Sequence, residues 1–63
     1  MAEIERYDPV MGTRLYLCVT GDGRKEWTDR FYSTEMPDAE AEQLAAAISP
    51  SMKSAGFVLE VLY

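Results

Sequence analysis

Histidine is absent from this 63-residue chain, and cysteine occurs once, as Cys18. Without histidine, neither a Ser-His-Asp nor a Cys-His nucleophile system can be built, and zinc loses its usual nitrogen ligands. A single cysteine forms no disulfide within the chain and no structural zinc site. We therefore predict that the chain is not an enzyme and holds no cofactor or metal, and that Cys18 is an inert core thiol in a reducing compartment.

Basic residues and long apolar runs are also scarce. Six Lys and Arg residues stand against eleven Asp and Glu residues, which gives a formal net charge of −5. This balance argues against general attraction to nucleic acid or to anionic lipid and favours a basic partner surface. No apolar run approaches the ~18 residues of a membrane span, and the charged start does not resemble a signal peptide. We expect a cytoplasmic protein without direct nucleic-acid or membrane contacts.

The apolar content is nevertheless high enough for a fold. Hydrophobic residues make up 48% of the chain, and seven residues are aromatic. A chain of this length forms one domain, residues 1–63, and buries only about 60% of its unfolded surface. The core is therefore expected to be small, with no room for an enclosed cofactor pocket.

Three segments have the pattern of β-strands. In the run at residues 14–20, apolar residues occupy both the odd-numbered and the even-numbered positions, as in a strand buried on two sides. The turn Gly21-Asp22-Gly23 joins it to a second strand at residues 26–32, in which Trp27 and Phe31 are expected to face the core. A third strand is predicted at residues 57–63, after Ala55-Gly56.

One helix is predicted at residues 37–48. Pro37 suits a first helical position, and acidic residues in the opening turns complement the helix dipole. The apolar residues follow an i, i+3, i+4, i+7 pattern: Ala41, Leu44, Ala45 and Ile48. Ser49-Pro50 is expected to end the helix, because proline interrupts the backbone ladder.

These elements predict an α+β fold of ββαβ type, with the helix packed on one face of a three-stranded antiparallel-type sheet. The predicted order is 2-1-3, with residues 14–20 in the middle and antiparallel to residues 57–63. Residues 1–12 show turn chemistry at Asp8-Pro9 but no clear periodicity. They are expected to form a loose arm, a short edge strand around residues 3–7, or a cover that folds back over the sheet.

A helix about 17 Å long and about 10 Å wide covers one face of this sheet but not both. The other face mixes aromatic, aliphatic and arginine side chains, a composition enriched at protein interfaces. We predict that six residues on this face bind a partner: Arg14, Tyr16, Arg30, Tyr32, Val58 and Leu62. Glu40 and Glu42 form a predicted secondary acidic patch at the helix start.

The order of elements resembles that of the small host RNA polymerase inhibitor made by some lytic podophages. The matching features are Trp27-x-x-x-Phe31-Tyr32, the acidic helix, and Ala55-Gly56-Phe57, which together span about 45 residues. In that family, arginines on the last strand and a carboxylate on the sheet grip the polymerase. This chain has no arginine between Leu59 and Tyr63, and Thr28 stands at the acidic position. The resemblance implies the fold and stoichiometric inhibition of a larger host protein, in the host cytoplasm.

The leading functional hypothesis is therefore a non-catalytic module that binds a protein, such as host RNA polymerase or another nucleic-acid-binding protein. Two alternatives stay open. A homodimer in which two copies bury the same face would have a structural or scaffolding role. An acidic patch around Glu40 and Glu42 would imitate nucleic acid and engage an arginine-rich partner.

Overall fold

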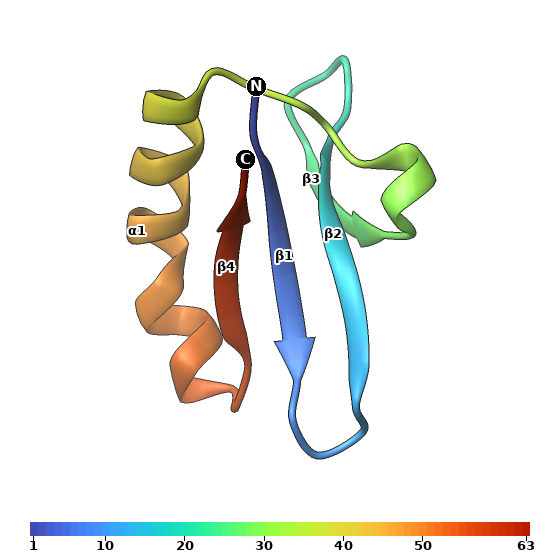
Figure 1. Ribbon diagram of the computed structural model, residues 1–63, viewed down its shortest axis with the longest axis vertical. Helices are drawn as coiled ribbons and strands as arrows, with labels where there is room; N and C mark the ends of the chain where they lie inside the picture. The colour runs from blue at the N-terminus through green and yellow to red at the C-terminus, as the bar shows by residue number, and fades with distance from the viewer.

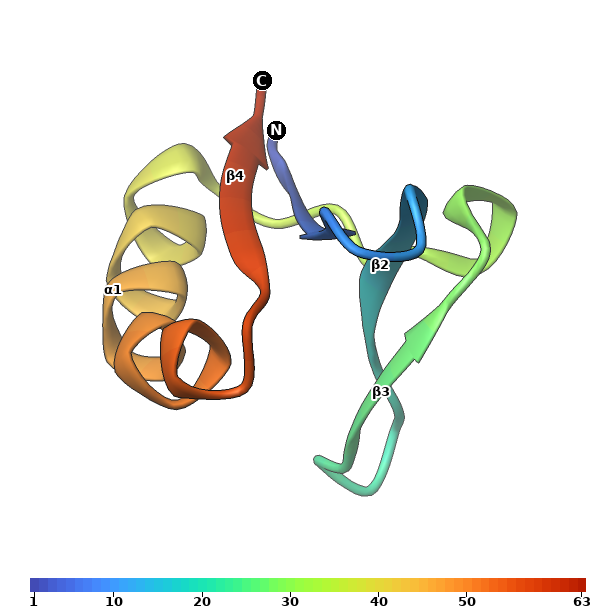
Figure 2. The same ribbon diagram turned by 90° about the horizontal axis from the view of Figure 1, so that it is seen from below.

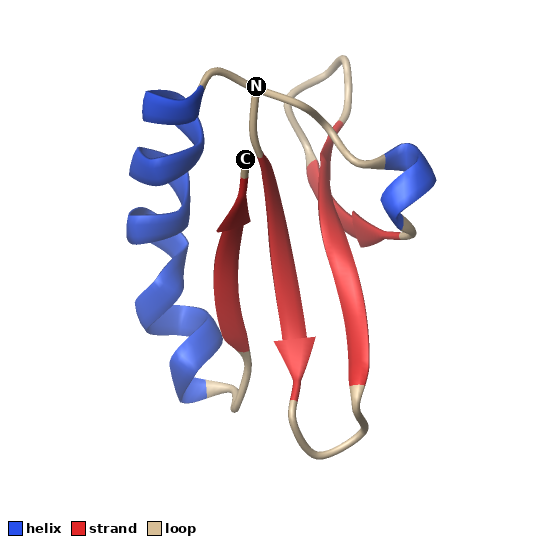
Figure 3. Cartoon of the chain, viewed as in Figure 1, coloured by secondary structure: helices blue, strands red, loops and turns tan.

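The computed structural model describes all 63 residues and contains four strands and one α-helix (Figure 1, Figure 3). The strands form one antiparallel sheet in the order β3-β2-β1-β4, and the helix packs against β4 and β1. The predicted α+β class, with one helix on one face of the sheet, is confirmed. The elements are β1 Glu3–Asp8, β2 Thr13–Val19, β3 Lys25–Thr28, the 3₁₀ turn η1 Arg30–Tyr32, α1 Asp38–Ser54 and β4 Val58–Leu62.

The strand expected around residues 3–7 is confirmed as β1, but it lies in the interior of the sheet, so the expectations of an edge position and of a loose arm are wrong. It pairs antiparallel with β2 on one side and with β4 on the other. The predicted order of the other three strands is kept, but β1 separates β2 from β4. Because β4 is antiparallel to β1, it runs parallel to β2, opposite to the predicted direction.

The position of β1 follows from its buried side chains. Ala2 and Ile4 are 1% and 0% exposed and point toward the helix side, while Glu3 and Glu5 alternate with them on the other face. The Asp8 carboxylate then accepts hydrogen bonds from the backbone N–H groups of Val10 and Met11, at 3.0 and 3.3 Å. This Asx turn reverses the chain into β2, as the turn chemistry at Asp8-Pro9 predicts.

Strand β3 is shorter than the predicted strand at residues 26–32. Trp27 lies half-buried on the helix side, but the chain leaves the sheet after Thr28, and Phe31 in η1 is 87% exposed. The expectation that Phe31 faces the core is therefore wrong. The chain turns here because the next segment must cross to the other side of β2 to reach α1.

Residues 33–36 insert between the end of β2 and the start of β1. Thr34 donates its N–H to the carbonyl of Leu17 at 2.9 Å, and its Oγ1 accepts the N–H of Val19 at 2.8 Å. Ala2 and Met36 exchange two backbone hydrogen bonds, at 2.7 and 2.9 Å. Residues 33–36 therefore separate the end of β2 from the start of β1. Figure 2 shows the β2–β3 ribbon turned away from β1 and β4.

Helix α1 continues past Pro50 to Ser54, so the predicted end at Ser49-Pro50 is wrong. The apolar stripe explains the extra turn, because Met52 follows Ala45 and Ile48 on the side that packs against β4. The helix ends in a Schellman motif in which Phe57 donates its N–H to the Met52 carbonyl at 2.9 Å. Gly56, at φ 92°, supplies the left-handed residue that this motif requires.

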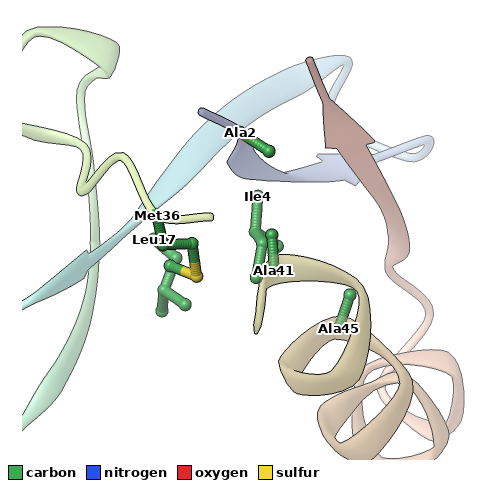
Figure 4. Close-up of a cluster of buried hydrophobic side chains, with 6 residues drawn as sticks. All are labelled: Ala2, Ile4, Leu17, Met36, Ala41 and Ala45. Atoms are coloured by element: carbon green, nitrogen blue, oxygen red, sulfur yellow. The ribbon is translucent and has the colours of Figure 1, made fainter. Parts of the chain in front are cut away.

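Six buried residues form the core, and they come from β1 and the residue before it, β2, the loop before the helix, and α1 (Figure 4). They are Ala2, Ile4, Leu17, Met36, Ala41 and Ala45. The predicted helix stripe is confirmed, since Ala41 and Ala45 are buried and Leu44 packs against them. Cys18 is only half-buried and lies on the opposite face, so its predicted place in the core is wrong. No helix has the length and apolar character needed to cross a membrane.

Candidate functional site

The sheet has one face turned away from α1, here called the open face. Strand register places Glu5 opposite both Tyr16 and Glu60, and places Tyr7 opposite both Arg14 and Val58. Residues 1–12 do not fold back over this face; they supply its central strand. The side chains on it are Glu3, Glu5 and Tyr7 from β1, Arg14, Tyr16 and Cys18 from β2, Glu26 and Thr28 from β3, and Val58, Glu60 and Leu62 from β4.

Glu5 is the centre of a fixed polar network on the open face. Its residue is only 7% exposed, and its Oε2 accepts a hydrogen bond from the Tyr16 hydroxyl at 3.1 Å. Nε of Arg14 lies 3.6 Å from the other carboxylate oxygen, and the guanidinium sits 4.6 Å from the Tyr7 ring centroid. Burial, with the hydrogen bond to Glu5 next, raises the pKa of Tyr16, so this hydroxyl stays a donor at neutral pH.

A second set of contacts ties η1 to the same face. Arg30 places its Nη2 3.2 Å from Oε2 of Glu3, and its guanidinium lies 5.6 Å from the Tyr16 ring centroid. The Ser33 hydroxyl donates to the other oxygen of Glu3. The bond from Ser33, assisted by Arg30 and opposed by burial, holds the pKa of Glu3 below its usual value. Glu3 thus remains charged and anchors Arg30 across the sheet.

Exposed apolar groups flank this network on both sides. Phe31 and Tyr32 in η1 pack edge to face, with 5.0 Å between their ring centroids, and they are 87% and 62% exposed. On β4, Val58 is 55% exposed and Leu62 is half-buried. Glu60 lies between these two on the same face, is exposed, and has no basic side chain within 4 Å.

The structure brings most of the predicted site residues together. Arg14, Tyr16 and Arg30 belong to one set of contacts on the open face. Tyr32 lies in the same short turn as Arg30, while Val58 and Leu62 lie on the same face across β1.

The predicted acidic patch lies apart from these residues. Glu40 and Glu42 are on α1, away from the open face, and Glu42 accepts a hydrogen bond from the Tyr63 hydroxyl at 2.5 Å. The structure therefore separates the acidic patch from the other six predicted residues.

Sequence reasoning missed Glu3, Glu5 and Tyr7 because it did not place β1 in the sheet. The signal that could have found them is the alternation of Ala2 and Ile4 with two glutamates. Their presence makes the centre of the open face more acidic than predicted. The two glutamates also form ion pairs with the two arginines, Glu3 with Arg30 and Glu5 with Arg14.

The helix side has a second surface that the sequence did not indicate. A hollow of about 620 Å³ lies between the start of α1 and the β2–β3 ribbon, lined by Val19, Lys25, Met36 and Leu44 among others. Also on this side, the Arg6 guanidinium sits 4.9 Å from the Trp27 ring centroid and 4.1 Å from that of Phe57. These cation–π contacts hold Arg6 without any carboxylate within 4 Å.

The chemistry available on the open face is that of hydrogen bonding, ion pairing and apolar contact. No group of three or more His, Cys, Asp or Glu side chains is arranged to hold a metal ion. Comparison with known proteins gives no relative to guide the interpretation: no protein-family model, no curated protein and no solved structure matches the chain.

Proposed function

We propose that the chain is a non-catalytic protein-binding module that modulates or inhibits a larger partner by occupying part of its surface through the open face. The observation that carries the proposal is that the chain leaves this face uncovered and fixes arginine and tyrosine side chains upon it. Tyrosine and arginine are the residue types most often found among binding hot spots, together with tryptophan.

The network favours binding because its side chains are already held in place. Ordering a free arginine or tyrosine at an interface costs about 0.5–1.5 kcal/mol for each side chain. Arg14 and Arg30 each contact a carboxylate and an aromatic ring before any partner arrives, although more than half of each side chain is exposed. Part of that ordering cost therefore falls on folding and not on association.

The dimensions suit an interface of ordinary size. The molecule measures 30 × 23 × 22 Å, so one broad face offers an area comparable with the ~800 Å² that each partner buries in a standard complex. The exposed Phe31 and Tyr32 and the apolar β4 side chains then serve as contact points beside the polar network.

A homodimer receives less support. The accessible surface of 4236 Å² is close to the ~4100 Å² expected for a folded monomer of 7.1 kDa. The chain therefore does not need a second copy to reach ordinary compactness. The resemblance in element order makes bacterial RNA polymerase the first partner to test, and the cytoplasm is part of the same proposal.

The test begins with affinity capture from a bacterial lysate and mass spectrometry, followed by titration of the purified partner. We expect Tyr32→Ala and Leu62→Ser each to weaken binding at least about tenfold, as loss of a hot-spot side chain does. Lys53→Ala, in the last turn of α1, is the matched control and should bind as the unchanged protein does.

Two outcomes contradict the proposal. One is a partner whose affinity is unchanged by both Tyr32→Ala and Leu62→Ser. The other is a partner lost only with Glu40→Gln and Glu42→Gln, which would move the function to the acidic helix start. Circular dichroism of each variant shows whether a loss of binding reflects a loss of fold.

A further inference from the structure

The outer edge of β4 has no hydrogen-bond partner. The strand pairs with β1 alone, and no turn, loop or side chain makes a hydrogen bond to the backbone of Val58–Leu62. Natural sheets usually protect such edges with charges, proline or bulges. β3, at the other edge, is short and carries Lys25 and Glu26, whereas β4 has five residues and a single charge, Glu60. The β4 edge is therefore the longer and the less charged of the two edges.

Positive charge is missing beside this edge. Glu60 lies directly opposite Glu5 in the β1–β4 register, and like charges in that position destabilise a sheet. Arg14 is the only basic residue within 4 Å of either carboxylate, and it contacts Glu5, at 3.6 Å. A cation supplied next to Glu60 from outside the chain would compensate this second carboxylate.

The neighbours of Glu60 specify what should flank such a cation. Val58 and Leu62 lie two residues to either side of Glu60 and share the open face with it. A strand added to β4 would place its alternate side chains opposite these three residues. The side chains between them would point to the helix side, where α1 runs alongside β4 (Figure 1).

We propose that the β4 edge binds an extended segment of the partner by strand addition, and that this segment has the pattern apolar, any, Lys or Arg, any, apolar. The basic side chain pairs with Glu60, and the two apolar side chains contact Val58 and Leu62. The inference rests on the proposed protein-binding function. It specifies which kind of partner segment would pair with β4, the strand at one border of the open face.

A second copy of the chain is a poor occupant of this edge. Antiparallel pairing of two β4 strands over their full length sets Glu60 opposite Glu60, because this residue is the middle one of Val58–Leu62. That register adds a further like-charge contact to the one with Glu5. Glu60 thus selects a basic segment and opposes self-pairing.

The experiment uses the full chain labelled with ¹⁵N and a capped nine-residue peptide, Ser-Thr-Val-Thr-Lys-Thr-Val-Thr-Ser. Titration should shift the amide signals of Val58–Leu62 most strongly and slow hydrogen exchange in β4. The same peptide with glutamate in place of lysine should bind about tenfold more weakly, because an attractive cross-strand pair becomes a repulsive one. A peptide N-methylated on the edge that faces β4 should not bind.

Two protein variants complete the design. Glu60→Gln should reduce the difference between the lysine and glutamate peptides to about twofold. Glu26→Gln removes a glutamate from the open face of the other edge strand and should leave the tenfold difference unchanged.

Four results of the peptide titrations overturn the inference. They are equal binding of the lysine and glutamate peptides, full binding of the N-methylated peptide, shifts centred away from β4, and no shift at millimolar peptide. A partner whose binding depends on Tyr32 but not on Glu60 would overturn it and leave the proposed function standing. A dimer dissociated by the lysine peptide would show that a second copy occupies the edge, and it would also reject the inference.

Discussion

Replacing Ile4 with alanine tests the most consequential feature of the fold, the central position of the first strand. Ile4 is 0% exposed and contributes to the core formed by β1, β2 and α1. The substitution removes three carbon atoms, which at about 0.8 kcal/mol each amounts to about 2.4 kcal/mol of lost transfer free energy. The remaining cavity raises the expected loss of stability to about 3–4 kcal/mol.

This loss is large for so small a domain. A chain of 63 residues is expected to have a free energy of unfolding of about 3–9 kcal/mol. Ile4→Ala should therefore remove a third or more of the total stability. In urea titrations followed by Trp27 fluorescence, the midpoint should fall by about 3 M for a denaturant slope near 1 kcal/mol per M.

The matched control is Val10→Ala, at the tip of the β1–β2 turn. Val10 is 87% exposed, so its truncation should change stability by less than about 0.5 kcal/mol. If Ile4→Ala shifted the midpoint no more than Val10→Ala does, β1 would not be a central strand. Rapid hydrogen exchange at the β1 amides would contradict the position of the strand independently.

Two further predictions concern the helix end and acid stability. Gly56→Ala should cost about 1 kcal/mol in urea titrations, because its φ of 92° strains any residue with a Cβ, although no atom lies within 4 Å. Ser33→Ala should raise the pKa of Glu3 toward its usual value of 4.5, measured by NMR titration of its carboxyl. A carboxyl whose pKa is lower in the folded protein than in the unfolded chain stabilises the fold at a pH above the unfolded-state pKa. This stabilisation is lost as the pH falls through the folded-state pKa. Because Ser33→Ala raises the folded-state pKa of Glu3, the variant should have less of this stabilisation and should lose it at a higher pH.

Each of these variants has a control in the same chain. Gly21 also has open space around it but no positive φ, so Gly21→Ala should change stability by less than about 0.5 kcal/mol. An equal cost at Gly21 and Gly56 would contradict the strain argument. For the titration, Ser51→Ala on the exposed helix surface should leave the Glu3 curve in place. A shift as large as that of Ser33→Ala would refute the assigned cause.

Local patterns were enough to predict the helix, the β2–β3 hairpin and the final strand. Each depends on periodicity or turn chemistry within a few residues, such as the helical stripe that contains Ala41 and Ala45. The same patterns placed Arg14, Tyr16 and Leu62 on one face, because side-chain parity in a strand is a local property.

The central position of β1 could not be predicted because its pattern is short and then broken. Only Ala2 and Ile4 mark its buried side, and Arg6 occupies the next position on that side. The Arg6 guanidinium is accommodated between the rings of Trp27 and Phe57, which come from distant parts of the chain. The helix extension past Pro50 likewise depends on packing against β4, a tertiary contact that outweighs the local signal.

The distribution of charge supports the proposal of a basic partner. Arg14, Arg24 and Arg30 are each paired with a carboxylate of the chain, and a fourth basic residue, Arg6, lies between two aromatic rings. Of the six basic residues, only the two lysines lack such internal partners. A phosphate backbone would have to compete with these contacts for four of the six cations.

In contrast to the arginines, most acidic residues have no cation of the chain as a partner. Only Glu3, Glu5 and Asp22 pair with basic side chains, and Asp38 lies 3.6 Å from the amino terminus. The other seven of the eleven carboxylates, Glu60 among them, have no cation of the chain within 4 Å. Because the arginines are engaged in internal contacts and these carboxylates are free, the partner proposed above is one that supplies positive charge. The proposed basic, extended protein segment would do so, whereas nucleic acid would not.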